Sequence, residues 1–481
     1  MKLIRLSLIA TAALALFSCT PKATAPLLVL HNIQWVDVTT GQLVQDQLLV
    51  IQQDRIQAIL PEAKLTDYPQ AQQLDGGGRY LIPGLWDMHV HFEGRDLVED
   101  NKLLLPVYLA YGITGVREAA SNLAPVVLNW RELVNQQKLL GPKIFTAGQK
   151  FEGINSLWDG DLEIGSEADM LAGMDKLQQM QVDFIKITEN TLQPDLYLAT
   201  IKEAKKRSLL VSSHVPYGTS IEQLAEAGLS SIEHASYLLR LGFADEAAVA
   251  AQVRAGTLTN QQAAEHYKTG FDQQQALQGY RMLKQLNVAV TPTLIGGRQL
   301  AHLHDTDHSH DEFLKYLTKD FTSNYQWRID RMANETPEQQ QQRKDKEQLI
   351  ASQLPYLQQA GITLLAGSDS AALNTYVYPA QALHDELELF QQAGLTPAQI
   401  LQTATINGAR FMHQDKDYGS IAVGKKADLV LLNQNPLLDI KASRSIDTLL
   451  YQGKVYNRAT LDQLLQQAEQ RKLELEQKTG S

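Results

Sequence analysis

The segment Leu81-Ile-Pro-Gly-Leu-Trp-Asp-Met-His-Val-His91 decides how the rest of the chain is interpreted. Pro83-Gly84 interrupts the backbone, and a short apolar run then leads to two histidines separated by one residue. Side chains alternate between the faces of a strand, so His89 and His91 project to the same side. Two imidazoles on one side of a strand end form half of a metal chelate. Because a His-x-His pair also fits an ordinary polar strand face, the remaining ligands must be found elsewhere in the chain.

Downstream of this segment, β-rich cores alternate with stretches of helical periodicity, which is typical of a mostly parallel α/β sheet. Eight such cores predict an α/β fold in the form of a closed (β/α)8 TIM barrel. The cores are residues 85–91, 114–118, 143–147, 184–188, 210–214, 231–234, 288–293 and 363–369. Two long gaps between cores predict helical insertions around residues 240–285 and 295–360.

Both ends of the chain have strand-and-turn composition and predict a second, smaller unit. We expect a small β-sandwich domain assembled from residues 19–82 and 416–457, which flank a barrel domain at 83–415. Residues 458–481 are charged and rich in glutamine, so they predict a helical tail whose surface is solvated.

The first residues predict export rather than a folded element. Residues 1–18 have a positive start and a short apolar run, as signal peptides do. The run ends at Cys19, the only cysteine, in a context that resembles a bacterial lipobox. We therefore expect a lipoprotein anchored to the outer membrane, facing the periplasm or the cell surface; a plain secretory signal is the alternative. Membrane contact would come from the lipid anchor alone, since no run reaches the roughly 18 apolar residues of a membrane span.

Net charge and composition exclude some partners and leave others open. The net charge of −11 argues against nucleic acid, whose phosphates require concentrated Lys and Arg. A small molecule or short peptide is the expected substrate, and a homo-oligomer is left open.

Polar residues recur at the ends of the predicted barrel strands, where barrel enzymes place their catalytic groups. One strand-end histidine is usually a hydrogen-bonded core residue, but a set of six chemically related side chains on five strands is hard to attribute to packing. The set predicts a metal site and consists of His89, His91, Lys186, His214, His234 and Asp369.

Several motifs occur in an order that resembles the amidohydrolase superfamily, and within it the imidazolonepropionase-like and Xaa-Pro-dipeptidase-like branch. They are Pro83-Gly-Leu-Trp-Asp-Met-His-Val-His91, Gly112-Ile-Thr-Gly-Val-Arg117, Asp183-Phe-Ile-Lys-Ile187, Ser231-Ile-Glu-His234, Ala366-Gly-Ser-Asp369, Ala404-Thr-Ile-Asn-Gly-Ala-Arg410 and Gly419-Ser-Ile-Ala-Val-Gly-Lys-Lys-Ala-Asp-Leu429. The resemblance covers nearly everything after residue 27.

The resemblance implies two divalent metal ions. His89, His91 and Asp369 would bind one, His214 and His234 the other, and Lys186 would bridge both after carboxylation by CO₂. A lysine ammonium has no lone pair for a cation, whereas a lysine carbamate offers two anionic oxygens. Imidazoles with carboxylate-type oxygens suit Zn²⁺ best, with Mn²⁺, Co²⁺ or Fe²⁺ also compatible.

The implied function is hydrolysis of a C–N amide or peptide bond by a metal-bridged hydroxide, with Asp369 as the catalytic base and then acid. The expected substrate is that of a dipeptidase or an N-acyl-amino-acid hydrolase. The alternatives are a cyclic-amide or lactone hydrolase and a non-catalytic surface-binding lipoprotein. A deaminase is the nearest chemical competitor, but mononuclear deaminases of this superfamily generally lack the lysine that Lys186 represents.

Three further residues are weaker candidates for substrate contact. Tyr217 follows His214, Arg117 follows the second predicted strand and competes with an internal ion pair, and Trp158 lies in a loop after the third strand. The histidine-rich tract at His302, His304, His308 and His310 is either a metal-binding tract or a solvated loop.

Overall fold

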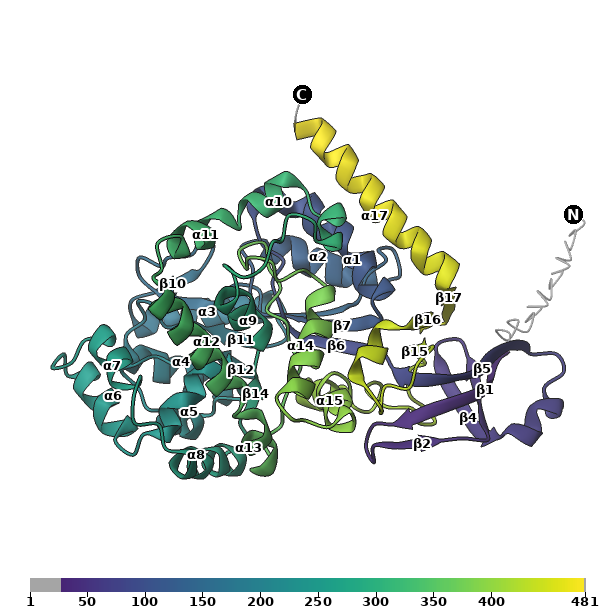
Figure 1. Cartoon of the computed structure of the whole chain (residues 1–481), viewed down its shortest axis with the longest axis horizontal. Helices are drawn as coiled ribbons and strands as arrows, with labels where there is room; N and C mark the ends of the chain where they lie inside the picture. The colour runs from purple at the N-terminus through teal and green to yellow at the C-terminus, as the bar shows by residue number, and fades with distance from the viewer. Residues whose placement is uncertain (1–26, 480–481) are drawn as a thin grey trace, which may run out of the picture.

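The computed structural model describes residues 27–479, so the predicted signal peptide and Cys19 lie outside the described part. Strands from both chain ends lie side by side at one end of the molecule, and the α/β part occupies the other (Figure 1). Within residues 27–479 no helix combines the length and apolarity needed to cross a membrane.

The two chain ends build one mixed sheet, as expected from their composition. β15 pairs antiparallel with β5, with Val430 opposite Ile82, and this pairing joins the C-terminal strands to the N-terminal ones. The strand order is β17-β16-β15-β5-β1-β3-β4, with β2 paired to β1. The strands are β1 (Leu27–Asp37), β2 (Gln42–Val44), β3 (Gln47–Gln52), β4 (Arg55–Pro61), β5 (Gln72–Pro83), β15 (Leu429–Leu432), β16 (Ile446–Tyr451) and β17 (Lys454–Asn457).

Parallel strands form the centre of the α/β part, in the orders β6-β7-β8 and β10-β9-β11-β12-β13-β14. Seven of the eight predicted cores contain one of these strands. The strands are β6 (Leu85–Val90), β7 (Ile113–Glu118), β8 (Lys143–Thr146), β9 (Phe151–Gly153), β10 (Leu162–Ile164), β11 (Ile185–Ile187), β12 (Val211–Ser213), β13 (Ser231–Glu233) and β14 (Ala289–Thr291).

The eighth predicted core, residues 363–369, is not a continuous strand. It contacts its neighbours through isolated parallel bridges, Val290 with Leu364 and Val90 with Ser370. Asp369 has a φ of 56°, which lies outside the β region and turns the backbone away from a regular ladder. The Asp369 backbone N–H still donates to the His89 carbonyl at 2.7 Å, so the segment lies directly against β6.

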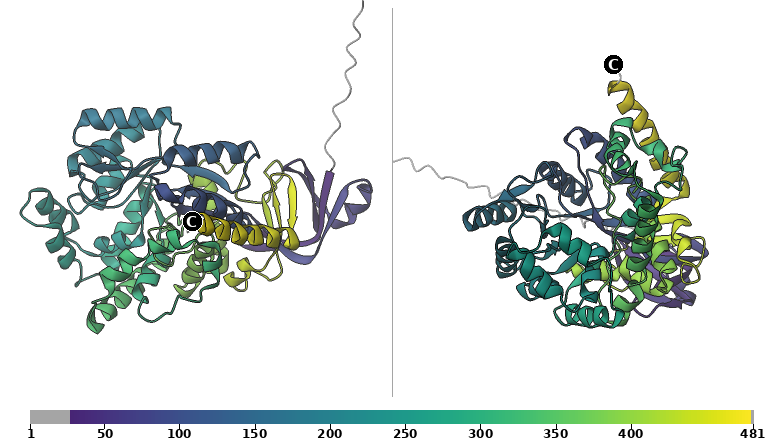
Figure 2. Two further views of the ribbon diagram at one scale, coloured as in Figure 1. Left: turned by 90° about the horizontal axis from the view of Figure 1, so that it is seen from above. Right: turned by 60° about the vertical axis from the view of Figure 1, so that its left-hand side comes forward.

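Helices surround the parallel strands (Figure 2). They are α1 (Val98–Ala110), α2 (Ala124–Asn135), α3 (Glu167–Gln179), α4 (Pro194–Lys206), α5 (Ile221–Ala227), α6 (Glu246–Arg254), α7 (Asn260–His266), α8 (Gln273–Gln285), α9 (Leu294–Ala301), α10 (Lys319–Ser323), α11 (Gln326–Met332), α12 (Pro337–Ala351), α13 (Leu354–Gln359), α14 (Gln381–Gln392), α15 (Pro397–Thr403) and α16 (Ile406–Phe411). The two predicted insertions contain α6 to α8 and α9 to α13.

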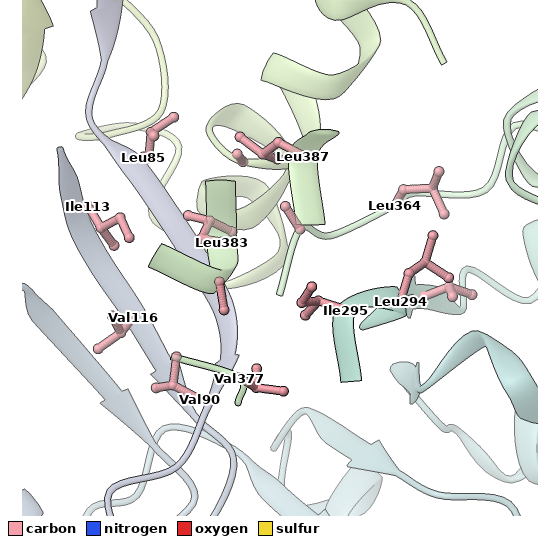
Figure 3. Close-up of a cluster of buried hydrophobic side chains, with 14 of the residues drawn as sticks. Leu85, Val90, Ile113, Val116, Leu294, Ile295, Leu364, Val377, Leu383 and Leu387 are labelled. Carbon is pink, nitrogen blue, oxygen red and sulfur yellow. The ribbon is translucent and has the colours of Figure 1, made fainter. Parts of the chain in front are cut away.

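Apolar side chains fill the space between the strands and α14. Leu383 and Leu387 of α14 lie between Leu85 of β6 on one side and Ile295 of α9 on the other (Figure 3). Ile113 and Leu364 belong to the same buried cluster. This cluster packs α14 against the parallel strands and α9.

The C-terminal tail differs from the expected solvated helix. It forms α17 (Arg458–Thr479), which packs along α1 and buries Leu461 and Ala468. Arg471 also pairs with Glu99 of α1 at 3.0 Å. The apolar residues recur at intervals of three and four and form a narrow stripe, which the surrounding Gln and Glu residues obscure in the sequence.

Candidate metal centre

The predicted ligands converge on one cavity of about 360 Å³. His91, His214, His234 and Asp369 line it together with Lys186, while His89 lies fully buried behind them. Each comes from the carboxyl end of a parallel strand or from the segment that replaces the eighth strand. The strand-end argument therefore places these side chains together in space.

The first pair of histidines shares a carboxylate. The Nε2 atoms of His89 and His91 lie 3.2 Å apart, and each lies 3.3 Å from Oδ1 of Asp369. Within residues 27–479 these three form the one group whose potential ligand atoms all approach within 4.8 Å of one another.

The second pair lies beside the first. The Nε2 atoms of His214 and His234 are 3.1 Å apart. The ring of His234 is 5.1 Å from that of His89, centroid to centroid, and its Nδ1 lies 4.0 Å from Oδ2 of Asp369. Asp369 is thus in reach of both pairs.

Hydrogen bonds at the opposite ring nitrogens fix the tautomer of all four histidines. Each Nδ1 faces an acceptor: Glu233 Oε2 for His89 at 2.7 Å, the Ala120 carbonyl for His91 at 2.8 Å, Glu189 Oε2 for His214 at 2.6 Å and Thr293 Oγ1 for His234 at 2.6 Å. The Thr293 hydroxyl donates to the Pro292 carbonyl at 2.8 Å, which leaves its oxygen to accept from His234. With the proton on Nδ1, every Nε2 carries a lone pair.

Two lone pairs that face each other repel unless a cation lies between them. Nitrogens bound to one Zn²⁺ at about 2.0–2.1 Å come to lie roughly 3.0–3.4 Å apart in a tetrahedral arrangement. The separations of 3.2 Å and 3.1 Å in the two pairs fit this arrangement. Each pair is therefore suited to hold one divalent ion.

Lys186 fits the role of a bridging carbamate. It is 1% exposed, and its Nζ has no hydrogen-bond partner in the described residues. An unpaired buried ammonium is costly, and burial lowers the pKa of Lys186 to about 8. The neutral amine is the form that reacts with CO₂, and the product would supply the two missing oxygen ligands.

The pKa values of the site are shifted in both directions. Burial and the nearby Lys186 lower the pKa of His89 to about 4, and burial also depresses the pKa of His234. Although burial opposes both shifts, contacts with Asp369 raise the pKa of His91, and the neighbouring histidines hold the pKa of Asp369 well below its usual range. His89 and His234 are therefore neutral imidazoles beside an ionised carboxylate.

Arg117 lies beneath the site rather than against substrate. It is fully buried, donates to Glu233 at 2.7 Å and 2.8 Å and to the Met88 carbonyl at 2.6 Å, and does not line the cavity. Although burial opposes it, Arg117 holds the pKa of Glu233 well below its usual range. This placement agrees with the internal ion pair and not with the substrate contact considered from the sequence. Arg117 keeps Glu233 ionised, and Glu233 orients His89.

Hydrogen bonds to Asp87 hold the turn that carries Asp369. The Ser368 backbone and hydroxyl donate to Asp87 at 2.9 Å and 2.6 Å. Gly367 lets this turn lie close to β6, because a Cβ at this position would lie only 2.8 Å from the Cβ of His89. Both Asp369 and His234 have positive φ, a conformation that concentrates at functional sites.

The two aromatic candidates have different positions. Trp158 lines the cavity and lies 6.0 Å from the ring of Trp327. Tyr217 instead stacks on Tyr267 at 6.4 Å and does not line the cavity, contrary to the suggested substrate contact. The ring of Tyr237 lies 5.6 Å from that of His214, and the Tyr237 hydroxyl donates to Glu189 at 2.5 Å.

The histidine-rich tract does not converge on a shared point. His302 pairs with Asp305 at 2.9 Å and His308 with Asp311 at 2.7 Å, each three residues along the chain. The imidazole of His308 also stacks on Tyr376 at 3.9 Å. His304 lies 4.0 Å from Glu335 instead, and His308 is buried. Among the described residues the tract therefore forms no shared metal-binding group.

The sequence interpretation missed three partners of the ligands, Glu189, Glu233 and Thr293. Glu233 directly precedes His234, and Glu189 follows β11 by two residues, so a search for strand-end carboxylates could have found both. Thr293 follows β14 in the same way, but threonine is too common at strand ends to be informative.

Comparisons with known proteins identify the family of this chain. A model of the amidohydrolase family matches residues 80–456, more than half of the chain. An imidazolonepropionase from Geobacillus sp. is 42% identical over 67 residues, 13% of this chain and 16% of its own. An adenine deaminase from Ruegeria sp. is 30% identical over 116 residues, 24% of this chain and 19% of its own. This chain thus spans about a fifth of the length of the curated relatives it matches.

The solved structures agree in fold. A structure described as a Xaa-Pro dipeptidase with bound methionine in the active site has a TM-score of 0.65 and 19% identity. The match covers 90% of this chain and all of that chain. At this identity the similarity concerns the fold, which is of the TIM-barrel type.

Proposed function

Because this chain belongs to the amidohydrolase family, we propose that it is a binuclear metal-dependent hydrolase that cleaves an amide C–N bond. One observation supports the proposal. Within each of two histidine pairs the Nε2 lone pairs face each other, and the unpaired Nζ of Lys186 lines the same cavity as Asp369.

The ligand assignments follow from the contacts. His89, His91 and Asp369 would hold one ion, His214 and His234 the other, and Lys186 as a carbamate would join both. Bound there, two such ions, most suitably Zn²⁺, would supply a nucleophile from water at neutral pH and polarisation of the scissile carbonyl.

Asp369 is suited to move the proton. Its carboxylate is ionised and is in reach of both histidine pairs, so it can accept a proton from the attacking water. It can then deliver this proton to the leaving amine nitrogen. The Ser368 and Asp87 contacts hold its turn in place during the transfer.

The proposed substrate is a dipeptide or an N-acyl amino acid. A cavity of about 360 Å³ lies at the small end of the range for small-molecule sites and suits a substrate of this size. A deaminase is the second candidate, because curated adenine deaminases match part of the chain. The unpaired Lys186 favours the two-metal amide hydrolase over it.

The proposal extends to architecture and location. The bridges on both sides of residues 364–370 support closure of the parallel strands into a barrel spanning residues 83–415, with the mixed sheet as a sandwich domain. We further propose export and lipid anchoring at Cys19. Replacement of Cys19 by Ser should release the protein from the membrane fraction, and unchanged membrane association would contradict the anchor.

A screen of dipeptides and N-acyl amino acids on metal-loaded enzyme tests the activity. We expect cleavage of at least one member, and Asp369→Asn should abolish it while most of the metal stays bound. Release of ammonia from adenine with no amide cleavage would instead favour the deaminase.

A further inference from the structure

Arg328 is a cationic side chain of the cavity that makes no ion pair among the described residues. Besides Lys186, the cavity is lined by Lys150 and Arg328. Lys150 pairs with Asp161 at 3.2 Å. Arg328, from α11 in the second insertion, has no carboxylate oxygen within 4.0 Å among residues 27–479, although it is only partly exposed.

The guanidinium of Arg328 is held in place by neutral groups. Its Nη2 donates to Asn374 Oδ1 at 2.5 Å, and Asn374 Nδ2 donates to the Asp369 carbonyl at 2.5 Å. Its Cζ lies 4.9 Å from the ring centroid of Trp327, whose Nε1 donates to the Leu373 carbonyl at 3.3 Å. These contacts hold helix α11 against residues 369–374, the segment that begins at the proposed base Asp369. Arg328 therefore has a defined position relative to Asp369.

The remaining donors of Arg328 face no protein acceptor in the described chain. Its Nε is buried without a partner, and its Nη1 makes no recorded hydrogen bond. Arg328 also lines a second cavity of about 260 Å³, which shares His234 and Asp369 with the first. The Arg328 side chain therefore lines both cavities, which share residues of the proposed metal centre.

A partly buried and fixed guanidinium that makes no direct ion pair can bind an anion, and a carboxylate matches its planar donor geometry. We propose that Arg328 binds the free carboxylate of the substrate while the scissile amide lies at the metal centre. The enzyme would then select amides of amino acids that retain a free carboxylate, such as dipeptides and N-acyl amino acids, over their carboxamides. This inference rests on the proposed amide hydrolase function and assigns the residue that selects its substrate class.

The alternative is that Arg328 only fastens α11 to Asn374. Loss of such a structural contact would weaken the binding of every ligand equally, whereas loss of a carboxylate contact would weaken the binding of the acid alone. The pair N-acetyl-L-leucine and N-acetyl-L-leucinamide separates the two cases, since they differ only in the carboxylate.

Isothermal titration of both compounds into zinc-loaded Asp369→Asn protein tests the proposal without turnover. We expect the acid to bind about 10- to 100-fold more tightly than the carboxamide, and Arg328→Met to remove this preference while leaving the carboxamide affinity unchanged. Arg328→Lys should retain part of the preference. Arg331→Met, an exposed residue on the same helix, is the matched control and should behave as the parent.

Equal binding of acid and carboxamide, no binding of the acid, or a preference that survives Arg328→Met would overturn the proposal. The titration is independent of hydrolysis. If the acid is preferred but no amide is cleaved by wild-type enzyme, the carboxylate site stands and the hydrolase proposal fails.

Discussion

The Nε2 atoms of His214 and His234 lie 3.1 Å apart, while the Nδ1 atoms of both rings point away to acceptors. This relationship repeats in His89 and His91 at 3.2 Å. Four imidazoles are thus oriented by groups outside the cavity, and their free lone pairs are directed into two small volumes. A protein that needed only packed histidines would gain nothing from placing the lone pairs against each other.

Glu189 is predicted to be essential for the affinity of the second ion. It accepts from His214 Nδ1 at 2.6 Å and from the Tyr237 hydroxyl at 2.5 Å, so it fixes both the ring and its tautomer. Glu189→Gln should weaken binding of one of the two ions about 10- to 100-fold, measured by competition with a metal indicator. Glu226→Gln, an exposed change on α5, is the control. Equal affinities in Glu189→Gln and wild-type protein would refute this role.

Lys186 is predicted to carry CO₂. Protein prepared with ¹³C-bicarbonate and metal should show a carbamate carbon resonance, because the buried Nζ lacks any other partner. The resonance should be missing from Lys186→Ala, which should also bind fewer metal ions, and it should persist in Lys176→Ala, whose side chain lies at the surface. A resonance that survives Lys186→Ala would assign the carbamate elsewhere.

The convergence of the proposed ligands was predictable because most of them lie at strand ends. Alternation in 85–91 placed His89 and His91 on one side, and the parallel order brought Lys186, His214 and His234 to the same edge. Asp369 was found as well, although its segment lacks a regular strand, because the Ala366-Gly-Ser-Asp369 motif marks it. The strand-and-turn composition of both chain ends correctly predicted that they join in one sheet.

Other features depend on tertiary contacts that no local pattern encodes. Arg117 is separated from Glu233 by more than 100 residues, and only the folded chain shows that the pair is buried below His89. Arg328 lies in a Gln-rich insertion without strand or motif signals, and its role emerges from contacts with Asn374 and Trp327. Tyr217 does not line the cavity, because proximity to His214 in sequence does not specify the direction that the chain takes after His214.

Asp428 provides a pH-dependent test of the mixed sheet. Burial raises the pKa of Asp428 to about 6 from an unfolded value of 3.8. Its raised folded pKa means that the folded state favours the protonated form, so stability falls as pH rises from about 4 to about 6.

Replacement of Asp428 by Asn should remove the loss of stability between about pH 4 and pH 6. Urea unfolding should show similar stability for variant and wild type near pH 4 and a more stable variant at pH 7. The gain should be at most about 3 kcal/mol, since each pKa unit corresponds to about 1.4 kcal/mol. Stability curves that run parallel from pH 4 to 7 would show that Asp428 does not titrate in this range.

Metal content per chain tests the central claim most directly. Protein loaded with Zn²⁺ and dialysed should contain about two ions per chain by elemental analysis, since each histidine pair holds one. His214→Ala/His234→Ala should retain about one, while His302→Ala/His304→Ala, in the histidine-rich tract, should retain about two. One ion or none in the wild-type protein, or two in His214→Ala/His234→Ala, would contradict the two-metal centre.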